Sequence, residues 1–118
     1  MSPLVEEKCV PCHGGVPPLN DAEIAQLLSE VPGWEVTEIE NQKRLQRTFK
    51  FKDFAHARDF TNRIGQIAEA EGHHPLMVTE WGKVTVAWWT HAIGGLHRND
   101  FIMAAKTNQI YAQISGIG

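Results

Sequence analysis

The segment from Phe54 to Ala68 limits most strongly which folds are open to this chain of 118 residues. Its small and apolar side chains recur at steps of three and four, the period of one helical face; they are Phe54, Ala57, Thr61, Ile64 and Ala68. Asp53 can cap this helix, Gly72 can end it in a left-handed turn, and Pro75 prevents it from continuing. The sequence therefore predicts a long helix with defined ends in the middle of the chain.

Segments with strand character flank this helix on both sides. They alternate in polarity or are rich in Val, Thr and Trp, and they are residues 34–39, 44–51, 76–80 and 83–90. A short helix that Asn20 or Asp21 can cap comes before them, and a last helix starts near residues 97–100. The order α-β-β-α-β-β-α predicts an α+β fold with a four-stranded antiparallel sheet and three helices packed on one face.

Length and composition bound the remaining organisation. A chain of this length forms one domain, which we place at residues 20–118, after an irregular Pro- and Gly-rich N-terminal arm at residues 1–19. A net charge of −3 argues against direct nucleic-acid binding. No apolar run approaches the ~20 residues of a membrane span, and the first residues do not follow a secretory pattern. We expect a cytoplasmic protein that binds no membrane.

The arm contains the only two cysteines, Cys9 and Cys12, followed by His13. This Cys-x-x-Cys-His pattern matches that of haem attachment, but no signal for export to an oxidising compartment accompanies it. The pattern could also supply half of a zinc site, but the sequence has no second ligand pair at standard spacing. The pattern favours two thiols in an irregular arm, and zinc and redox roles stay open as alternatives.

The highest concentration of titratable side chains in the sequence is a cluster of histidines and carboxylates. Glu69, Glu71, His73 and His74 lie within six residues, and Thr90-His91 follows sixteen residues later. Histidine is the side chain best suited to move protons near neutral pH. With no nucleophilic Ser motif and no Cys beside the cluster, this composition indicates acid–base work on a small bound molecule.

A hairpin rule predicts that these histidines converge. Gly82-Lys83 suits a two-residue type II′ loop, in which case Trp81 faces Val84. Counting outward from that loop places His74 opposite His91, and directly opposed side chains lie ~5 Å apart on one face.

The pattern formed by these residues resembles the signature of the pterin-4a-carbinolamine dehydratase family. The matching positions are Glu69, His73-His74-Pro75, Trp81, His91 and Asp100. Segments that look like the same family are Pro32-Gly33-Trp34, residues 49–54 and Gly94-Gly95-Leu96. The resemblance covers roughly residues 19–112, and the joint spacing of three His and one Asp is more specific than His-His-Pro alone.

The resemblance implies dehydration of 4a-hydroxytetrahydropterin to quinonoid dihydropterin, with no metal or organic cofactor. The enzyme would be a 4a-hydroxytetrahydrobiopterin dehydratase, a carbon–oxygen lyase that regenerates pterin after an aromatic amino acid hydroxylase, and it would be a homodimer or homotetramer. His73 and His91 would form the acid–base pair, and His74 would hold the substrate. Four residues would line or support the pocket; they are Glu69, Pro75, Thr90 and Asp100. Trp34 would contact the ligand.

Several residues depart from the pattern or need their own interpretation. His97 and Asn99 stand where a capping hydroxyl and a charged residue are expected before Asp100, and His56 and His97 are interpreted as surface or capping residues. Among the tryptophans, Trp88 shares parity with buried valines and is predicted to lie in the core, while Trp34, Trp81 or Trp89 would supply an aromatic wall. We interpret Glu71 as a solvated charge.

Two other functions compete with the dehydratase. Three His and a carboxylate can hold a metal ion, but adjacent residues such as His73 and His74 in an extended chain point to opposite sides. A non-catalytic adaptor of the same fold, like a transcriptional coactivator, would show an exposed apolar patch instead of a histidine-lined pocket. The sequence does not distinguish a dimer from a tetramer, or one pterin side chain from another.

Overall fold

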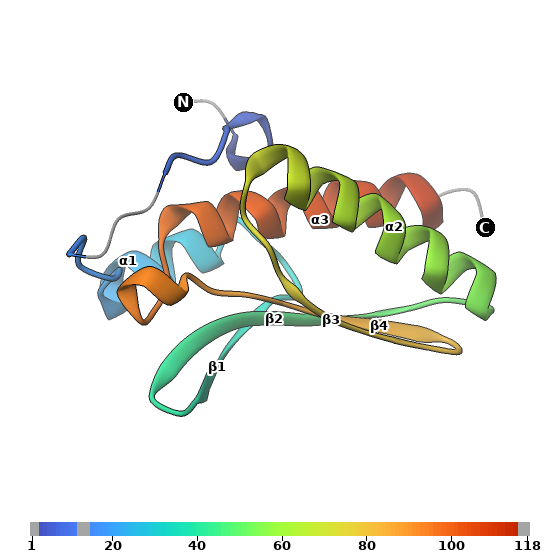
Figure 1. Ribbon diagram of the computed structural model, residues 1–118, viewed down its shortest axis with the longest axis horizontal. Coiled ribbons are helices and arrows are strands. Elements are labelled where there is room, and N and C mark those ends of the chain that lie inside the picture. Colours follow the sequence, from blue (N-terminus) through green and yellow to red (C-terminus); the bar gives the residue numbers. More distant parts are fainter. Residues whose placement is uncertain (1–2, 12–14, 116–118) are drawn as a thin grey trace.

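Three helices lie on one face of a four-stranded antiparallel sheet in this computed structural model, which describes residues 3–11 and 15–115 (Figure 1). The elements in chain order are η1 (Leu4–Glu6), α1 (Asp21–Leu28), β1 (Glu35–Ile39), β2 (Gln42–Lys50), α2 (Phe54–Glu71), β3 (Leu76–Glu80), β4 (Lys83–Trp88), η2 (His91–Ile93) and α3 (Arg98–Ser115). The predicted fold class and the α-β-β-α-β-β-α order are confirmed.

The ends of the helices follow local chemistry. Asn20 accepts a hydrogen bond from the backbone of Glu23 and completes a capping box at the start of α1. Asp53 accepts from the backbone of His56 at the start of α2. Gly72 has a φ of 67° and ends α2 in the left-handed conformation. The predicted caps of α2 are confirmed, and they fix where the chain leaves that helix toward His73.

The core lies between the sheet and the two long helices. The strand order is β1-β2-β4-β3, so β2 and β4 are central. Their inward side chains are fully or almost fully buried, and they are Leu45, Phe49, Val84, Val86 and Trp88. They pack in one cluster with buried residues of α2 and α3 such as Phe60 and Phe101. This layer confirms the predicted core position of Trp88, which supports His73 in the site described below.

The predicted register of the second hairpin is wrong by two residues. Glu80 pairs with Lys83 and Thr79 with Val84, so Trp81-Gly82 forms the loop. Gly82 does not have the positive φ of a type II′ turn. A shift of two keeps every side chain on its original face, so the alternation of polarity cannot detect it. His74 is therefore not paired with His91 in a ladder, since β3 begins only at Leu76.

The Pro32-Gly33-Trp34 segment is fixed by an amide on α3. Asn108 accepts hydrogen bonds from Trp34 Nε1 and Arg47 Nη1, both at 2.7 Å, and donates to the Pro32 carbonyl at 3.1 Å. Gly33 has a φ of +89°, and a Cβ there would lie 2.8 Å from the Arg47 guanidinium. The segment thus joins the start of β1 to α3 at a point where only glycine fits without strain.

Gly33→Ala is expected to lower the free energy of unfolding by about 1–3 kcal/mol, because it adds backbone strain and displaces Arg47. Urea denaturation measures this change. Gly65→Ala is the matched control, since Gly65 lies inside α2 with open space around its Cα. That variant should raise stability by about 0.5–1 kcal/mol through helix propensity. Equal stability of Gly33→Ala and the wild type would contradict the interpretation.

The sheet face turned away from the helices carries exposed apolar side chains. Leu76 and Val78 of the edge strand β3 are each nearly half exposed, and Figure 1 shows no helix on that side. Such a face or edge suits a second copy of the chain, and a homodimer or homotetramer stays a prediction.

In the described part of the chain, no helix combines the length and the hydropathy needed to cross a membrane.

Candidate active site

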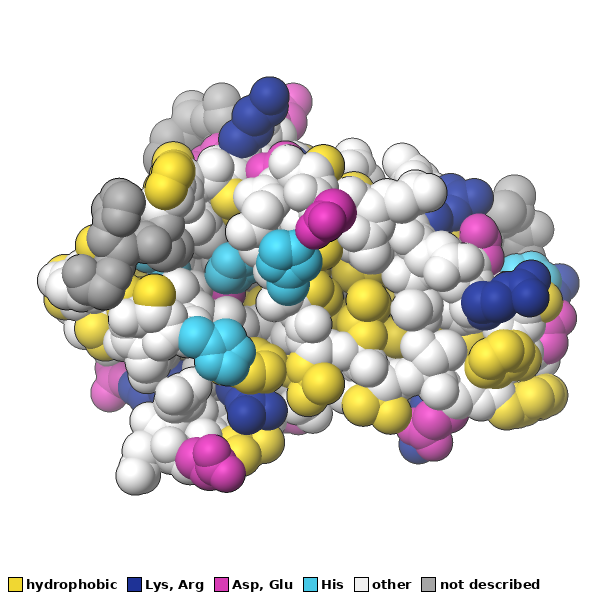
Figure 2. All heavy atoms as spheres, viewed as in Figure 1, with side chains coloured by type: hydrophobic (Ala, Val, Ile, Leu, Met, Phe, Trp, Pro, Cys, Tyr) yellow, Lys and Arg dark blue, Asp and Glu magenta, His cyan; other side chains and the backbone are white. Residues whose placement is uncertain are grey.

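An open pocket of about 480 Å³ is lined by half of the predicted site residues, among them all three predicted histidines. Its walls come from the end of α2, the segment after β4, the start of α3 and the N-terminal arm, and they consist of Cys9, Val10, Pro11, Glu71, Gly72, His73, His74, Trp89, Thr90, His91, Ala92 and Asn99. Figure 2 shows histidine side chains gathered around a hollow on this face. Three histidines from two distant chain segments therefore face one cavity.

His73 is the most firmly held of these histidines. Its Nε2 lies 2.6 Å from Asp100 Oδ1, and its side chain is only 12% exposed. The imidazole stacks on Trp88, with ring centroids 5.7 Å apart and planes inclined by 8°. A carboxylate bound to Nε2 holds the ring in the tautomer that carries its proton there. Nδ1 is then the nitrogen of His73 that can accept a proton.

Asp100 is fully buried and has three hydrogen-bond partners. Besides His73, its carboxylate accepts from Thr90 Oγ1 and from the backbone N–H of His97, both at 2.9 Å. Asp100 also lies in the first turn of α3, where the helix dipole favours a negative charge. Hydrogen bonds and the helix dipole therefore stabilise the buried Asp100 carboxylate behind the His73 imidazole.

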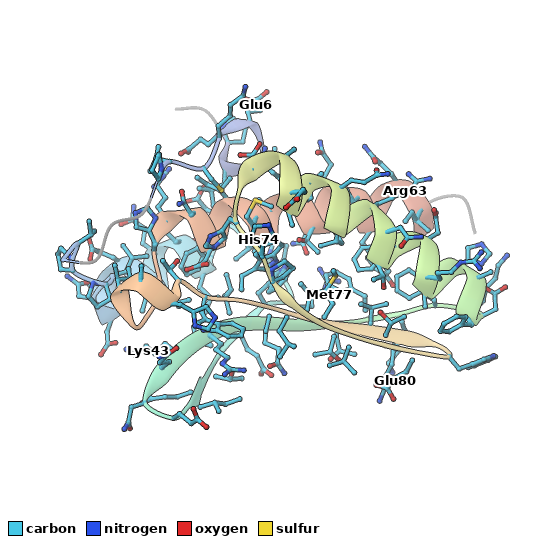
Figure 3. The ribbon with its side chains drawn as sticks, viewed as in Figure 1. Glu6, Lys43, Arg63, His74, Met77 and Glu80 are labelled. Atoms are coloured by element: carbon cyan, nitrogen blue, oxygen red, sulfur yellow. The ribbon has the colours of Figure 1, made fainter. Side chains whose placement is uncertain are left out.

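His74 occupies the solvent side of the pocket. Its Nε2 is 2.6 Å from Glu69 Oε1, and both side chains are mostly exposed. In Figure 3, His74 lies just beyond the end of α2 and above the start of β3. His73 and His74 thus point to different surroundings, as predicted for adjacent residues in an extended segment.

His91 follows the end of β4 and contacts Trp89. Trp89 Nε1 donates to His91 Nδ1 at 3.3 Å, and the two ring centroids are 4.7 Å apart. The Arg44 guanidinium lies over the Trp89 ring, 3.9 Å from its centroid. This arrangement fixes the tryptophan and leaves His91 Nε2 as the nitrogen without a contact to Trp89.

The structure brings together some predicted site residues and separates others. His73, His74, Thr90 and His91 line the pocket. Glu69 and Asp100 support two of the histidines from outside it. Pro75 is not among the lining residues.

Trp34 is placed differently from the prediction. It is buried against Phe49, with ring centroids 5.8 Å apart, and it bonds Asn108. It does not line the pocket. Trp34 instead packs in the core, where it joins the start of β1 to α3. Trp89 supplies the aromatic side chain of the pocket wall. Trp81 is 70% exposed in the hairpin loop and lies outside the wall as well.

Sequence reasoning missed two contributions to the pocket. Glu71 is not simply a solvated charge, because its Oε1 accepts from the Cys9 backbone at 2.8 Å and it lines the pocket. Residues 9–11 of the arm form part of the wall, a role that the sequence pattern does not predict for them. No periodic pattern marks either contact, since they join segments 62 or more positions apart. Cys12 and His13 lie outside the described residues.

His97 caps α3 with its imidazole. Its Nδ1 accepts from the backbone of Asn99 at 3.0 Å while Asp100 accepts from the backbone of His97 at 2.9 Å. The residue that departs from the family pattern therefore replaces the expected hydroxyl as a cap. Burial lowers the pKa of His97; the Asp100 carboxylate raises it in opposition, and His73 lowers it further. A neutral ring is what this acceptor role requires.

His97 should make stability depend on pH. Because its pKa is lower in the folded chain than its ordinary value of 6.5, the unfolded chain binds more protons in mild acid. The contribution of His97 to the free energy of unfolding is then complete above about pH 6.5 and lost as pH falls through the folded-state pKa. Denaturation at several pH values checks this, with His97→Asn as the control that caps without titrating. Parallel curves for the two proteins would contradict it.

Within residues 3–11 and 15–115, no group of three or more His, Cys, Asp or Glu is arranged to hold a metal ion. The absence of a metal from the reaction stays a prediction, which a chelator tests below.

The sequence that forms most of this pocket matches a known protein family. A model of the family described as pterin 4 alpha carbinolamine dehydratase matches residues 17–110. The chain belongs to this family. The match includes every histidine of the pocket and Asp100, but it begins after the arm residues that line the same pocket.

Relatives of the family extend the similarity over nearly the whole chain. A protein of Gloeobacter violaceus, provisionally named pterin-4-alpha-carbinolamine dehydratase 1, is 54% identical over 97% of this chain and 98% of its own. A Chlorobium limicola protein, provisionally named pterin-4-alpha-carbinolamine dehydratase, is 58% identical over 94% of this chain and 98% of its own. The crystal structure of a transcriptional coactivator/pterin dehydratase from Brucella melitensis has a TM-score of 0.73 and 32% identity, covering 80% of this chain and 98% of that one.

Proposed function

We propose that this protein removes water from 4a-hydroxytetrahydropterin to give quinonoid dihydropterin. The observation that carries the proposal is the His73–Asp100 pair at 2.6 Å, on a pocket that His74 and His91 also line. A histidine backed by a buried carboxylate is a common arrangement for proton transfer. Membership of the family supports the same reaction class.

The reaction needs two proton transfers. The C4a–O bond breaks as the hydroxyl receives a proton and leaves as water, while N5 loses its proton and forms a double bond to C4a. We assign the base to His73, because Asp100 occupies Nε2 and leaves the Nδ1 lone pair. We assign the acid to His91 in its protonated form, in which Nδ1 carries a proton and gives up the hydrogen bond from Trp89, and Nε2 gives its proton to the hydroxyl. The two rings then exchange protons with solvent and return to their starting states.

His74 and Trp89 are suited to hold the flat substrate. Trp89 offers an aromatic surface beside His91, and His74, oriented by Glu69, can donate to the polar edge of the pterin. The pocket volume of about 480 Å³ is within the ~300–1,000 Å³ range of small-molecule sites. Thr90 has a supporting role in this proposal, because its hydroxyl is bound to Asp100.

The adaptor alternative finds less support. Its expected signature was an exposed apolar patch without a histidine-lined pocket. Leu76 and Val78 are exposed on the open sheet face, but the same chain has the pocket described above. The name of the Brucella melitensis structure joins both roles for that protein. For this chain the pocket favours the enzyme, and regeneration of tetrahydrobiopterin after aromatic hydroxylation is the use we propose.

A direct assay with chemically prepared 4a-carbinolamine tests the function. We expect the protein to speed formation of the quinonoid product, followed by its absorbance, and we expect a chelator to leave the rate unchanged. A rate equal to that of the uncatalysed reaction would overturn the proposal. Loss of activity on chelation would instead favour the metal alternative.

A further inference from the structure

Residues 4–10 of the N-terminal arm are attached to helix α3 at several points. Leu4 is 3% exposed in the core cluster. The Val5 carbonyl accepts from Lys106 Nζ at 2.8 Å, and Glu7 receives two hydrogen bonds from the Arg98 guanidinium at 2.9 and 2.6 Å. A pair of hydrogen bonds from one guanidinium to one carboxylate fixes direction as well as distance. Residues 4–7 therefore lead the chain along α3 toward the pocket.

Asn99 holds the next part of the arm by both of its amide atoms. Val10 N donates to Asn99 Oδ1 at 3.0 Å, and Asn99 Nδ2 donates to the Val10 carbonyl at 2.7 Å. Glu71, at the end of α2, accepts from Cys9 N at 2.8 Å. Asn99 is 2% exposed, so the hydrogen bonds of its side-chain amide to the arm are made by a buried residue and not by one at the surface. It is also the residue immediately before Asp100 in α3.

These contacts place residues 9–11 in the wall of the histidine pocket. Cys9, Val10 and Pro11 line it together with His73, His74 and His91. Val10 is 57% exposed, so it offers apolar area to a ligand. The first turn of α3 thus has two tasks, since Asp100 orients His73 while Asn99 orients the opposing backbone segment. The matched family model starts at residue 17 and does not include this wall.

We propose that Cys9–Pro11 form a substrate-contacting wall of the active site and that Asn99 is the positioning residue for that wall. The inference rests on the proposed function and names a part of the binding site outside the family signature. Bound pterin lies against the apolar face of this segment, which shields the ring from water. Loss of the wall should weaken ground-state and transition-state binding alike, so that KM rises while kcat is nearly retained.

Protection of Cys9 from alkylation tests the wall without using catalysis. In a Cys12→Ser variant, Cys9 is the only cysteine of the chain, and its reaction with iodoacetamide can be followed by mass. Saturating 7,8-dihydrobiopterin, a flat analogue of the product, should slow this reaction about tenfold or more, since a ligand in contact blocks access. Tryptophan fluorescence measures binding of the same ligand independently. Binding without protection of Cys9 would overturn the inference.

Kinetics of Asn99→Ala test the positioning role. We expect KM to rise about tenfold with kcat within about twofold, together with loss of the ligand's protection of Cys9. Asn108→Ala is the matched control, because it removes another α3 amide that bonds Trp34, Arg47 and Pro32 rather than the arm. An unchanged KM in Asn99→Ala, or an equal rise in both variants, would overturn the role.

Two further results separate the possible failures. If Asn99→Ala does not fold, Glu71→Ala removes the Cys9 contact from the other side of the arm and should raise KM in the same direction. If the wild-type protein neither binds the pterin nor dehydrates the carbinolamine, the proposed function fails and this inference fails with it. Dehydration with normal binding but no effect of the arm overturns only the inference.

Discussion

His73→Ala and His91→Ala will each lower the rate of carbinolamine dehydration by about 10²–10⁴-fold, the usual contribution of one positioned acid or base. Both rings line the pocket, and His73 is backed by a buried carboxylate. The loss should appear mainly in kcat, because the proton transfers occur in the transition state. The stopped-flow absorbance of the quinonoid product measures it.

Matched variants show whether the effect is specific. His56→Ala removes a histidine that bonds Asp53 and lies at the opposite end of α2 from the pocket. It should keep full activity. His74→Ala should act more on KM, since His74 is assigned to substrate binding. Circular dichroism should show folded protein in all four variants, and full activity of both His73→Ala and His91→Ala would remove the proposed acid–base pair.

Asp100→Asn is expected to reduce both stability and activity. The carboxylate accepts three hydrogen bonds in a fully buried position. An amide of the same shape turns its NH₂ group toward at least one of those partners. It then either leaves the His97 N–H unpaired, at a cost of about 1–3 kcal/mol in the free energy of unfolding, or donates to His73 and holds that ring in the opposite tautomer. The rate should fall about 10–100-fold, because the His73 tautomer is no longer fixed.

Asp53→Asn is the control for that substitution. Asp53 also starts a helix, but it is half exposed at the surface, and Asn caps as well as Asp. Its effect on stability should stay below about 0.5 kcal/mol, and its activity should be unchanged. If urea midpoints and rates are the same for Asp100→Asn and Asp53→Asn, the buried carboxylate has neither role.

The helix boundaries show how far local reasoning extends. Asp53 and Gly72 delimit α2 as predicted, because caps depend on hydrogen bonds and φ angles within a few residues. The pairing of the second hairpin shows the opposite case. Both the predicted and the observed register bury Val84 and Val86, so only the geometry of the turn decides between them, and Gly82 does not follow the type II′ rule.

The convergence of the histidines was predicted correctly, but for the wrong reason. His74 and His91 do line one pocket, although no ladder pairs them. What brings them together is the position of the α2 end beside the segment after β4, and both segments are held by α3 through Asp100. A pairwise strand rule cannot describe a site that three elements build around one buried carboxylate.

The order of residue types along the chain determined the element order, the caps of α2 and the proton-transfer chemistry of the histidines, since each of these depends on neighbours in sequence. Only the tertiary structure decided that Trp34 belongs to the core, that Trp89 faces the pocket and that residues 9–11 form part of its wall. Those outcomes rest on contacts such as Trp34 with Asn108 and Val10 with Asn99, which join residues 74 and 89 positions apart. Such contacts form only when the whole domain packs, so no local pattern in the chain encodes them.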